Sequence, residues 1–356
     1  MFLVSKGKSL SLTSICSEYW EKLNKTKSSG AHHDNALKKK ITKALRNETD
    51  EKLFFFYALL AKNKWALLKE LVVAKPDRLL QLSQEMDKRT LAGKIPAFWE
   101  TVNGKVKATS HGTKVMDIFN YSGLRGSYVF TWLSHTLDLP ICPYCNFENT
   151  ISIKKEVLNK SGKKILVDQH LFTYNHFMIK SMYPYLSASF WNLVPSCHNC
   201  NSNLKGDDTF VPGTDVHPYV DDVSKISAFT LGGIPTVGTR SFNLRFIPKN
   251  AVQSEIDQVR RFDKVFQIEQ RYKHFQSDMF YLNTERMYYD DSSKENLLNS
   301  GFTALRFADM KEVVRHIAER VRIPLDNSDA LRQTKGKLMM DLAYELGITT
   351  YKGTAP

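Results

Sequence analysis

The stretch NLVPSCHNCN (Asn192–Asn201) contains the second of two Cys-x-x-C pairs, Cys197 and Cys200. The first pair, Cys142 and Cys145, lies in the sequence CPYC. In a Cys-x-x-C turn two thiolates can point at one ion, and two such turns complete the tetrahedral set of sulfur ligands that zinc prefers. We therefore expect a structural zinc ion held by all four cysteines, which would staple distant parts of the chain together.

Other interpretations of the cysteines are weaker. A redox-active pair normally lies in a thioredoxin-like strand–helix–strand context, which the flanking sequence lacks, and two unrelated buried pairs would not be expected to match in spacing. Cys16 has no such partner and is expected to be a small buried apolar residue. Paired cysteines that bind metal favour a reducing compartment, so we expect the protein to be cytoplasmic.

The composition of the 356-residue chain is that of a basic, globular protein. It has 50 Lys and Arg against 37 Asp and Glu, a net charge of +13, and 42% hydrophobic residues. This apolar content is sufficient for packed cores, and the positive charge favours nucleic acid as a partner over a merely soluble basic surface. The residues MFLVSKGKSLSLT lack the apolar run of a signal peptide. Leu53–Leu68 is too short and too basic to cross a bilayer, so we expect a buried helix there and no membrane partner.

Apolar periodicity divides the chain into three regions, residues 1–112, 113–220 and 221–356. The first has the repeat of helices from about Thr13 to Glu100, and the polar stretch Asn103–Lys114 is expected to be a linker or loop. The second contains both cysteine pairs and a strand-like segment, TISIKKEVLNKSGKKILVDQHLFTYNHF, with a turn at Asn159–Gly162. We therefore expect a helical domain followed by a mixed one.

The third region begins with a short strand-like segment at Ile226–Pro248. Helices are expected at Ser254–Tyr289, Ala308–Val321 and Asp329–Leu346, the last ended by Gly347. This region is expected to dock a partner or DNA. The fold class predicted for the whole chain is α+β and mostly helical.

His176, Asn192 and Asn201 occur in this order between the cysteine pairs and just after them, and Lys205-Gly206 follows. This order, with the run NLVPSCHNCN, resembles the HNH family of ββα-metal endonucleases over roughly Ile118–Tyr219. The resemblance implies a zinc-stapled ββα core and metal-dependent hydrolysis of DNA phosphodiester bonds.

The resemblance also implies roles for individual residues. His176 would be the general base that deprotonates the attacking water. Asn201 would bind the catalytic Mg²⁺ or Mn²⁺ through its amide oxygen, and Asn192 would hold the loop and the imidazole. Asn175 stands where the family usually has an aspartate that also binds this cation. An amide oxygen brings no charge, which implies weakened or disabled cleavage.

Three explanations of Asn175 stay open: a natural variant that works with a neutral ligand, a natural loss of cleavage, and a deliberate substitution. A different ligand pair, Asp168 and His170, is also conceivable. On an unbroken strand, however, His170 would lie about 20 Å from His176 at a rise of ~3.3 Å per residue. The rival of the nuclease is a catalytically inert HNH-fold subunit that binds nucleic acid or serves assembly.

Substrate contacts are expected from cationic side chains that position the phosphates flanking the scissile one: Lys180, Lys205 and His198. Three aromatic residues could stack on bases, although aromatic residues at this density are more often core: Tyr183, Tyr185 and Trp191. One basic helix face could contact phosphate or be only solvated: Lys38, Lys39, Lys40, Lys43 and Arg46.

A narrower resemblance extends beyond the core. The segments that carry it are IFNYSGLR (Ile118–Arg125), HFMIKSMYPYLSASFWNLVPSC, His217-Pro218-Tyr219, RFDKVFQIEQRYKHF and KLMMDLAYELGI. They are similar to the HNH nuclease subunit of Septu-type anti-phage defence systems. This similarity implies an effector of anti-phage defence that is controlled by an ABC-type ATPase partner. The first hundred residues have no counterpart in it.

Overall fold

The computed structural model describes residues 11–25, 36–119, 123, 127–159, 161–236, 238–300 and 306–350. Helices dominate these residues, and the strands form four separate two-stranded antiparallel sheets. The predicted α+β class is confirmed at this level. None of the helices in the described ranges is long and apolar enough to cross a membrane.

The N-terminal part consists of α1 (Leu12–Leu23), α2 (Leu37–Asn47), α3 (Glu51–Val73), α4 (Pro76–Leu91), β1 (Trp99–Val102) and β2 (Lys105–Ala108). The helical prediction for this region is therefore confirmed as far as Leu91. Local signals explain the helix starts, because Asp50 accepts a hydrogen bond from Leu53 N at the start of α3 (2.9 Å) and Pro76 opens α4.

Two sequence predictions for the end of this part are wrong. Glu100 lies in β1 and not in a helix, and the stretch expected to be a linker or loop contains β2 and the first half of α5 (Ser110–Phe119). Asn103 and Gly104 both have positive φ, 52° and 72°, and form the turn of the β1–β2 hairpin. An Asn-Gly pair is favoured in such turns because both residues tolerate this backbone conformation.

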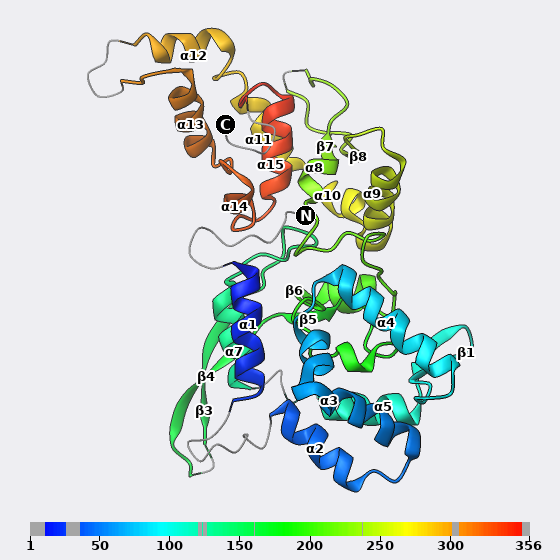
Figure 1. Cartoon of the computed structure of the whole chain (residues 1–356). Coiled ribbons are helices and arrows are strands. Elements are labelled where there is room, and N and C mark those ends of the chain that lie inside the picture. The colour runs from blue at the N-terminus through cyan, green and yellow to red at the C-terminus, as the bar shows by residue number, and fades with distance from the viewer. Residues whose placement is uncertain are drawn as a thin grey trace.

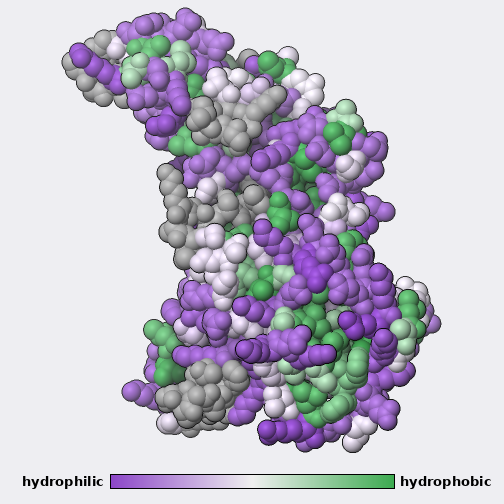
Figure 2. Space-filling model, viewed as in Figure 1, coloured by the Kyte–Doolittle hydropathy of each residue, from purple (hydrophilic) through white to green (hydrophobic). Residues whose placement is uncertain are grey.

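The helix expected at Leu53–Leu68 is interrupted. Residues Lys62–Trp65 are not helical, and the last three of them have positive φ. The polar run Lys62-Asn63-Lys64 breaks the apolar repeat, so the two halves of α3 turn different faces to the core. Leu60 and Leu68 are fully buried on either side of the break, whereas Phe54 is exposed on the outside. Figure 2 shows a patch of apolar residues over these N-terminal helices.

Gly112 packs directly against the backbone of Phe98, the residue before β1. A Cβ atom at this position would lie 2.0 Å from Phe98 O, and a backbone oxygen cannot move aside as a flexible side chain can. We expect Gly112→Ala to lower the free energy of unfolding by roughly 1–3 kcal/mol, as overpacking of a tight contact does. Denaturant unfolding measures this, with Thr113→Ala, an exposed neighbour, expected to change stability by less than about 0.5 kcal/mol. Equal stability of the two variants would contradict the close approach.

The middle of the chain consists of α7 (Tyr128–Leu137), β3 (Ser152–Leu158), β4 (Lys164–His170), β5 (Thr173–His176), η1 (Pro184–Leu186), β6 (Leu193–Ser196) and η2 (Asn199–Lys205). The predicted strands and their turn are confirmed, with Asn159 N donating to Lys163 O (2.9 Å). β4 pairs with β3, but β5 pairs with β6, so that Asn175 faces Val194 and His176 faces Leu193 in register.

The C-terminal part consists of α8 (Val223–Ile226), β7 (Ser227–Thr230), β8 (Arg245–Pro248), α9 (Gln253–Phe266), α10 (Ile268–Tyr272), α11 (Gln276–Glu285), α12 (Asp291–Leu298), α13 (Met310–Val321), α14 (Asn327–Ala330) and α15 (Gly336–Glu345). Two of the predicted helices are broken, because Gln267 separates α9 from α10 and Lys335 precedes α15, both with positive φ. Gly347 has a φ of 73° and follows α15, as predicted.

One continuous cluster of buried residues runs through all three parts, from Ile15 to Ile348. Figure 1 shows β5 and β6 between the N-terminal helices and the elements of the C-terminal part. Trp191 Nε1 donates to Val73 O (3.1 Å), which ties the middle to α3. Trp191 and Tyr185 are buried and Tyr183 is half-buried, so the core interpretation of these aromatic residues is confirmed for the first two. Cys16 is buried as predicted.

Candidate functional site

The two cysteine pairs come together. Cys142, Cys145, Cys197 and Cys200 are buried, and their Sγ atoms all lie within 4.8 Å of one another. The Cys145 and Cys197 Sγ atoms are 3.9 Å apart, close to the ~3.8 Å that tetrahedral ligation with zinc–sulfur bonds of ~2.3 Å would give. The described cysteines form no disulfide. The four thiols therefore have the chemistry and the spacing to hold a metal ion such as zinc.

Hydrogen bonds fix both turns that carry these cysteines. Asn146 N donates to Cys142 O (2.8 Å) in the first, and Asn201 N donates to Cys197 O (3.1 Å) in the second. Burial raises the pKa of the Cys200 thiol. Burial also opposes ionisation of Cys145, but hydrogen bonds from the other three thiols lower its pKa. Four thiolates this close would repel one another, so the cluster is suited to a bound cation.

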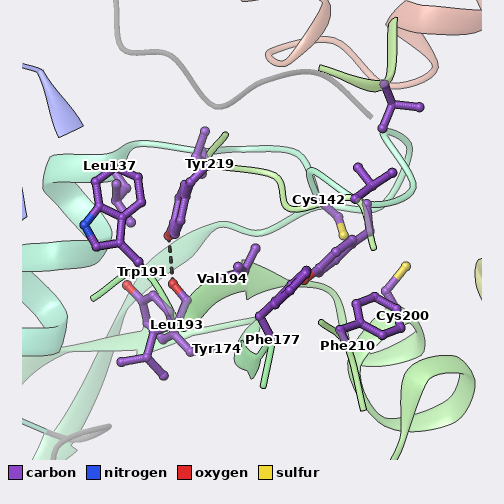
Figure 3. Packing of buried hydrophobic residues seen from close by; sticks show 14 of the residues in the cluster. Leu137, Cys142, Tyr174, Phe177, Trp191, Leu193, Val194, Cys200, Phe210 and Tyr219 are labelled. Carbon is purple, nitrogen blue, oxygen red and sulfur yellow. Dashed lines mark hydrogen bonds between the residues drawn. The ribbon is translucent and has the colours of Figure 1, made fainter. Parts of the chain in front are cut away.

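Helix α10 supports the cluster from the C-terminal part. Arg271 Nη1 lies 3.5 Å from Cys200 Sγ, and Tyr272 Oη donates to Cys145 O (2.6 Å). A divalent ion with four thiolates would carry two net negative charges, which the guanidinium partly offsets. The sequence patterns did not single out these two residues, although both lie in the segment RFDKVFQIEQRYKHF. In Figure 3, Cys142 and Cys200 lie at the edge of the cluster of buried residues that includes Phe177 and Phe210.

His176 lies at the end of β5 and is half-buried as a residue. Its Nε2 lies 3.1 Å from Ser187 O. A carbonyl oxygen only accepts, so Nε2 is the nitrogen that carries the proton of the neutral ring and Nδ1 carries the lone pair. Burial, with smaller effects of the Lys180 and Lys205 charges, lowers the pKa of His176 to about 3. The imidazole is therefore neutral at pH 7.

Asn175 is buried and its amide is held at both ends. Tyr144 Oη donates to Asn175 Oδ1 (3.2 Å), and Asn175 Nδ2 donates to Asn201 Oδ1 (2.6 Å). Tyr144 lies between Cys142 and Cys145, and Asn201 directly follows Cys200. Asn175 thus joins β5 to both cysteine turns.

Asn192 holds the loop between β5 and β6. Its Oδ1 accepts from Met178 N (2.7 Å), and its Nδ2 donates to Met178 O (3.0 Å) and Leu186 O (3.2 Å). The sequence predicts that this amide holds both the loop and the imidazole. The imidazole donates instead to the backbone oxygen of Ser187, which Asn192 positions through Leu186. Any residue has a carbonyl, so no sequence signal could have identified Ser187.

A cleft of about 700 Å³ opens beside His176. Its walls come from α5, β5, the loop after β5, and η2 with the residues that follow it. The cleft brings together six of the residues proposed from the sequence: Asn175, His176, Lys180, His198, Asn201 and Lys205. Asp207 also lines it and was missed, although it directly follows the Lys205-Gly206 motif.

The cations of this cleft differ in accessibility. Lys180 and His198 are exposed, as a contact with a polyanion requires. Lys205 is 2% exposed, and its Nζ donates to His176 O (3.1 Å) and to Asp208 O (2.8 Å). Burial lowers the pKa of Lys205 to about 8. The expected phosphate contact is thus corrected: the ammonium group of Lys205 is turned inward and fixes the backbone of the histidine.

The second ligand pair considered from the sequence lies elsewhere. Asp168 forms ion pairs with Lys154 (2.8 Å) and His135 (3.1 Å), and His170 Nδ1 lies 2.7 Å from Ser152 Oγ. Neither residue lines the cleft. The chain leaves the β3–β4 sheet after His170, so these side chains belong to a different ribbon from β5.

His217 is a buried imidazole that must stay neutral. Its Nε2 lies 2.8 Å from Trp191 O and so carries the proton, and Nδ1 accepts from Tyr219 N (3.2 Å). Burial lowers the pKa of His217 to about 4. As the pH falls, His217 in the unfolded chain binds its second proton near pH 6.5, whereas in the folded chain it does so only near pH 4. Folding stability therefore falls as the pH drops from about 6.5 to about 4.

We expect His217→Gln to remove part of this acid sensitivity. A pKa difference of roughly 2.5 units corresponds to about 3 kcal/mol at the acid end of the window. The measurement is urea unfolding at pH 7.5 and pH 4.5 for the chain and for the variant. Glutamine loses packing, so the quantity to compare is the change between the two pH values and not stability at one pH. An unchanged pH dependence would contradict the neutral, buried imidazole.

Comparisons of the chain with protein-family models, with curated proteins and with solved structures find no match. The fold and the site together define a class of protein. This is an α+β protein with a buried four-cysteine cluster that can hold a metal ion, beside a polar cleft that contains a neutral histidine.

Proposed function

We propose that this protein is a metal-dependent endonuclease of the HNH type that hydrolyses phosphodiester bonds of DNA. The observation that carries the proposal is the convergence of Asn175, His176 and Asn201 on one cleft. Asn175 and His176 lie in β5, which pairs with β6, and Asn201 lies in η2, the helix that follows β6. These elements lie next to the four-cysteine cluster. This order of strands, helix and cysteines is what the sequence resemblance predicts for a zinc-stapled ββα core.

In the proposed reaction His176 Nδ1 accepts a proton from the attacking water. Asn201 would hold a Mg²⁺ or Mn²⁺ ion through its amide oxygen, together with the side chain at position 175; such an ion stabilises negative charge on the phosphate. Lys180 and His198 would position the neighbouring phosphates. Lys205 and Asn192 hold the backbone around the imidazole.

Asn175 limits this activity. Its Nδ2 donates to Asn201 Oδ1, the oxygen that is expected to bind the cation. An N–H group cannot ligate a cation, and the two amides bring no negative charge. This observation favours a second candidate function for the chain with asparagine at this position, a catalytically inert subunit that binds nucleic acid or serves assembly.

A place in anti-phage defence under the control of an ABC-type ATPase is proposed from the sequence resemblance. Of its motifs, IFNYSGLR lies largely outside the described residues. RFDKVFQIEQRYKHF forms the end of α9 and all of α10, which supports the cysteine cluster, and KLMMDLAYELGI forms nearly all of α15. Co-purification of the chain with the product of a neighbouring gene tests this partner, and an ATPase is the expected result.

The nuclease proposal is tested by nicking of a supercoiled plasmid in Mg²⁺ or Mn²⁺. We expect His176→Ala to abolish cleavage in a chain in which position 175 carries aspartate, because the base is lost. DNA binding by both chains, measured by fluorescence anisotropy, should stay within about twofold, since the imidazole is not a phosphate contact. Binding without cleavage in every variant would favour the inert subunit.

A further inference from the structure

A smaller pocket of about 380 Å³ lies between the end of α4, the start of β1 and the short helix η1. Asp87 and Leu91 line it from α4, Trp99 lines it from β1, and Tyr185 lines it from η1. In the described part of the chain, no residue lines both this pocket and the cleft beside His176. The two sites are therefore separate.

Two polar groups of this pocket have no partner among the described residues. Asp87 is exposed and forms neither a hydrogen bond nor an ion pair with them. Tyr185 is only 1% exposed, and its hydroxyl makes no hydrogen bond to them, yet the hydroxyl is not sealed off from solvent. Burial, and then the charge of Asp87, raise the pKa of Tyr185, so the carboxylate and the phenol lie near each other. Both groups are available to a ligand.

The pocket is acidic although the chain is strongly basic. Among the described residues that line it, Asp87 is the only charged one, whereas the whole chain has a net charge of +13. The carboxylate would repel a phosphate group and attract a cation. None of the described lysine and arginine side chains pairs with Asp87. The cation that this pocket suits therefore comes from another molecule.

The apolar part of the lining matches the stem of a long cationic side chain. Leu91 is 89% exposed at the rim, and Phe98 and Trp99 add aromatic rings. An arginine side chain packs its methylene groups on apolar surface, while its guanidinium donates to oxygen atoms and stacks on aromatic rings. No described residue of the lining carries a positive charge that could pair with the α-carboxylate of a free amino acid. The pocket therefore fits an arginine within a polypeptide.

We propose that this pocket docks an arginine side chain of a partner protein, with the guanidinium group bound by the Asp87 carboxylate and the Tyr185 hydroxyl. Leu91 and Trp99 cover the aliphatic stem. Because the pocket and the cleft share no described lining residue, this docking site does not depend on whether the chain cuts DNA.

The test is an NMR titration of the ¹⁵N-labelled full chain. The indole N–H signal of Trp99, assigned by its loss in Trp99→Phe, reports on the pocket. We expect N-acetylarginine amide to shift this signal with a dissociation constant of about 1 mM. N-acetylcitrulline amide has nearly the same shape but no charge, so it should bind about tenfold more weakly.

Three variants assign this binding to particular groups. Asp87→Asn should abolish the difference between the arginine and citrulline derivatives, because the charge that attracts the guanidinium is lost. Tyr185→Phe should weaken binding of the arginine derivative about threefold, as the loss of one hydrogen bond would. The matched control is Glu100→Gln, an exposed residue next to Trp99 that does not line the pocket. Its affinity should stay within about twofold.

Several results would overturn the proposal. These are equal binding of the two derivatives, no shift of the Trp99 signal up to about 20 mM N-acetylarginine amide, or equal weakening by Asp87→Asn and Glu100→Gln. An Asp87-dependent shift caused by guanosine, with none caused by the arginine derivative, would assign the pocket to a nucleic-acid base instead. Free arginine that binds about tenfold more tightly than its capped derivative would assign it to a small molecule.

Discussion

Replacement of Cys142 by serine is expected to abolish metal binding by the four-cysteine cluster and to unfold the middle of the chain. Elemental analysis should find about one zinc per chain before the change and almost none after it, because a serine hydroxyl is a poor ligand next to three thiolates. Structural zinc contributes roughly 10–16 kcal/mol of apparent binding free energy in small zinc-finger peptides. A third of that would already be comparable with the whole stability of a typical domain, about 5–15 kcal/mol.

The matched control for this experiment is Cys16→Ser. Cys16 is equally buried and lies in α1, away from the four-cysteine cluster. This variant loses some packing but should keep one zinc per chain. Retention of zinc and of a cooperative unfolding transition by Cys142→Ser would show that the four thiols do not form the metal site.

The parts of the site that could be predicted from the sequence are those that depend on local spacing. Cys-x-x-C turns, the Asn159–Gly162 turn and the short strands are determined by neighbouring residues, and the structure has them. The same reasoning is incomplete at Asn103–Gly104, where the turn residues predict a linker or loop although the chain on either side forms strands. Turn residues alone do not distinguish the two, because the hairpin depends on how the flanking strands pair.

Contacts between distant segments could not be predicted in this way. Arg271 and Tyr272 reach the cysteine cluster from α10, and nothing in their own neighbourhood indicates this. The burial of Lys205 could not be predicted from local sequence either, because a lysine in a basic motif is expected at the surface. Its ammonium group is buried because His176 O and Asp208 O lie within hydrogen-bonding distance. Such partners are set by the tertiary fold.

Asn175→Asp is expected to create a cation site and to turn on, or strongly increase, DNA cleavage. The new carboxylate oxygen would take the place of Nδ2, 2.6 Å from Asn201 Oδ1 in the present structure. Two acceptor oxygens this close repel each other, and a divalent cation that binds both removes the repulsion. Metal-ion stabilisation of a phosphate transition state contributes several kcal/mol, which corresponds to a rate increase of roughly 10² or more.

The comparison that isolates this effect is Asn203→Asp. Asn203 is exposed on η2, and the change is the same in size and charge, but the residue does not line the cleft. We expect plasmid nicking in Mg²⁺ or Mn²⁺ to rise with Asn175→Asp alone, to disappear when EDTA is added, and to disappear again when His176→Ala is combined with it. The Asn201 amide could instead turn and donate its Nδ2 to the new carboxylate, which would satisfy both side chains without a cation. In that case the variant would bind no Mn²⁺ and cut no DNA, and the cleft would be that of a binding protein.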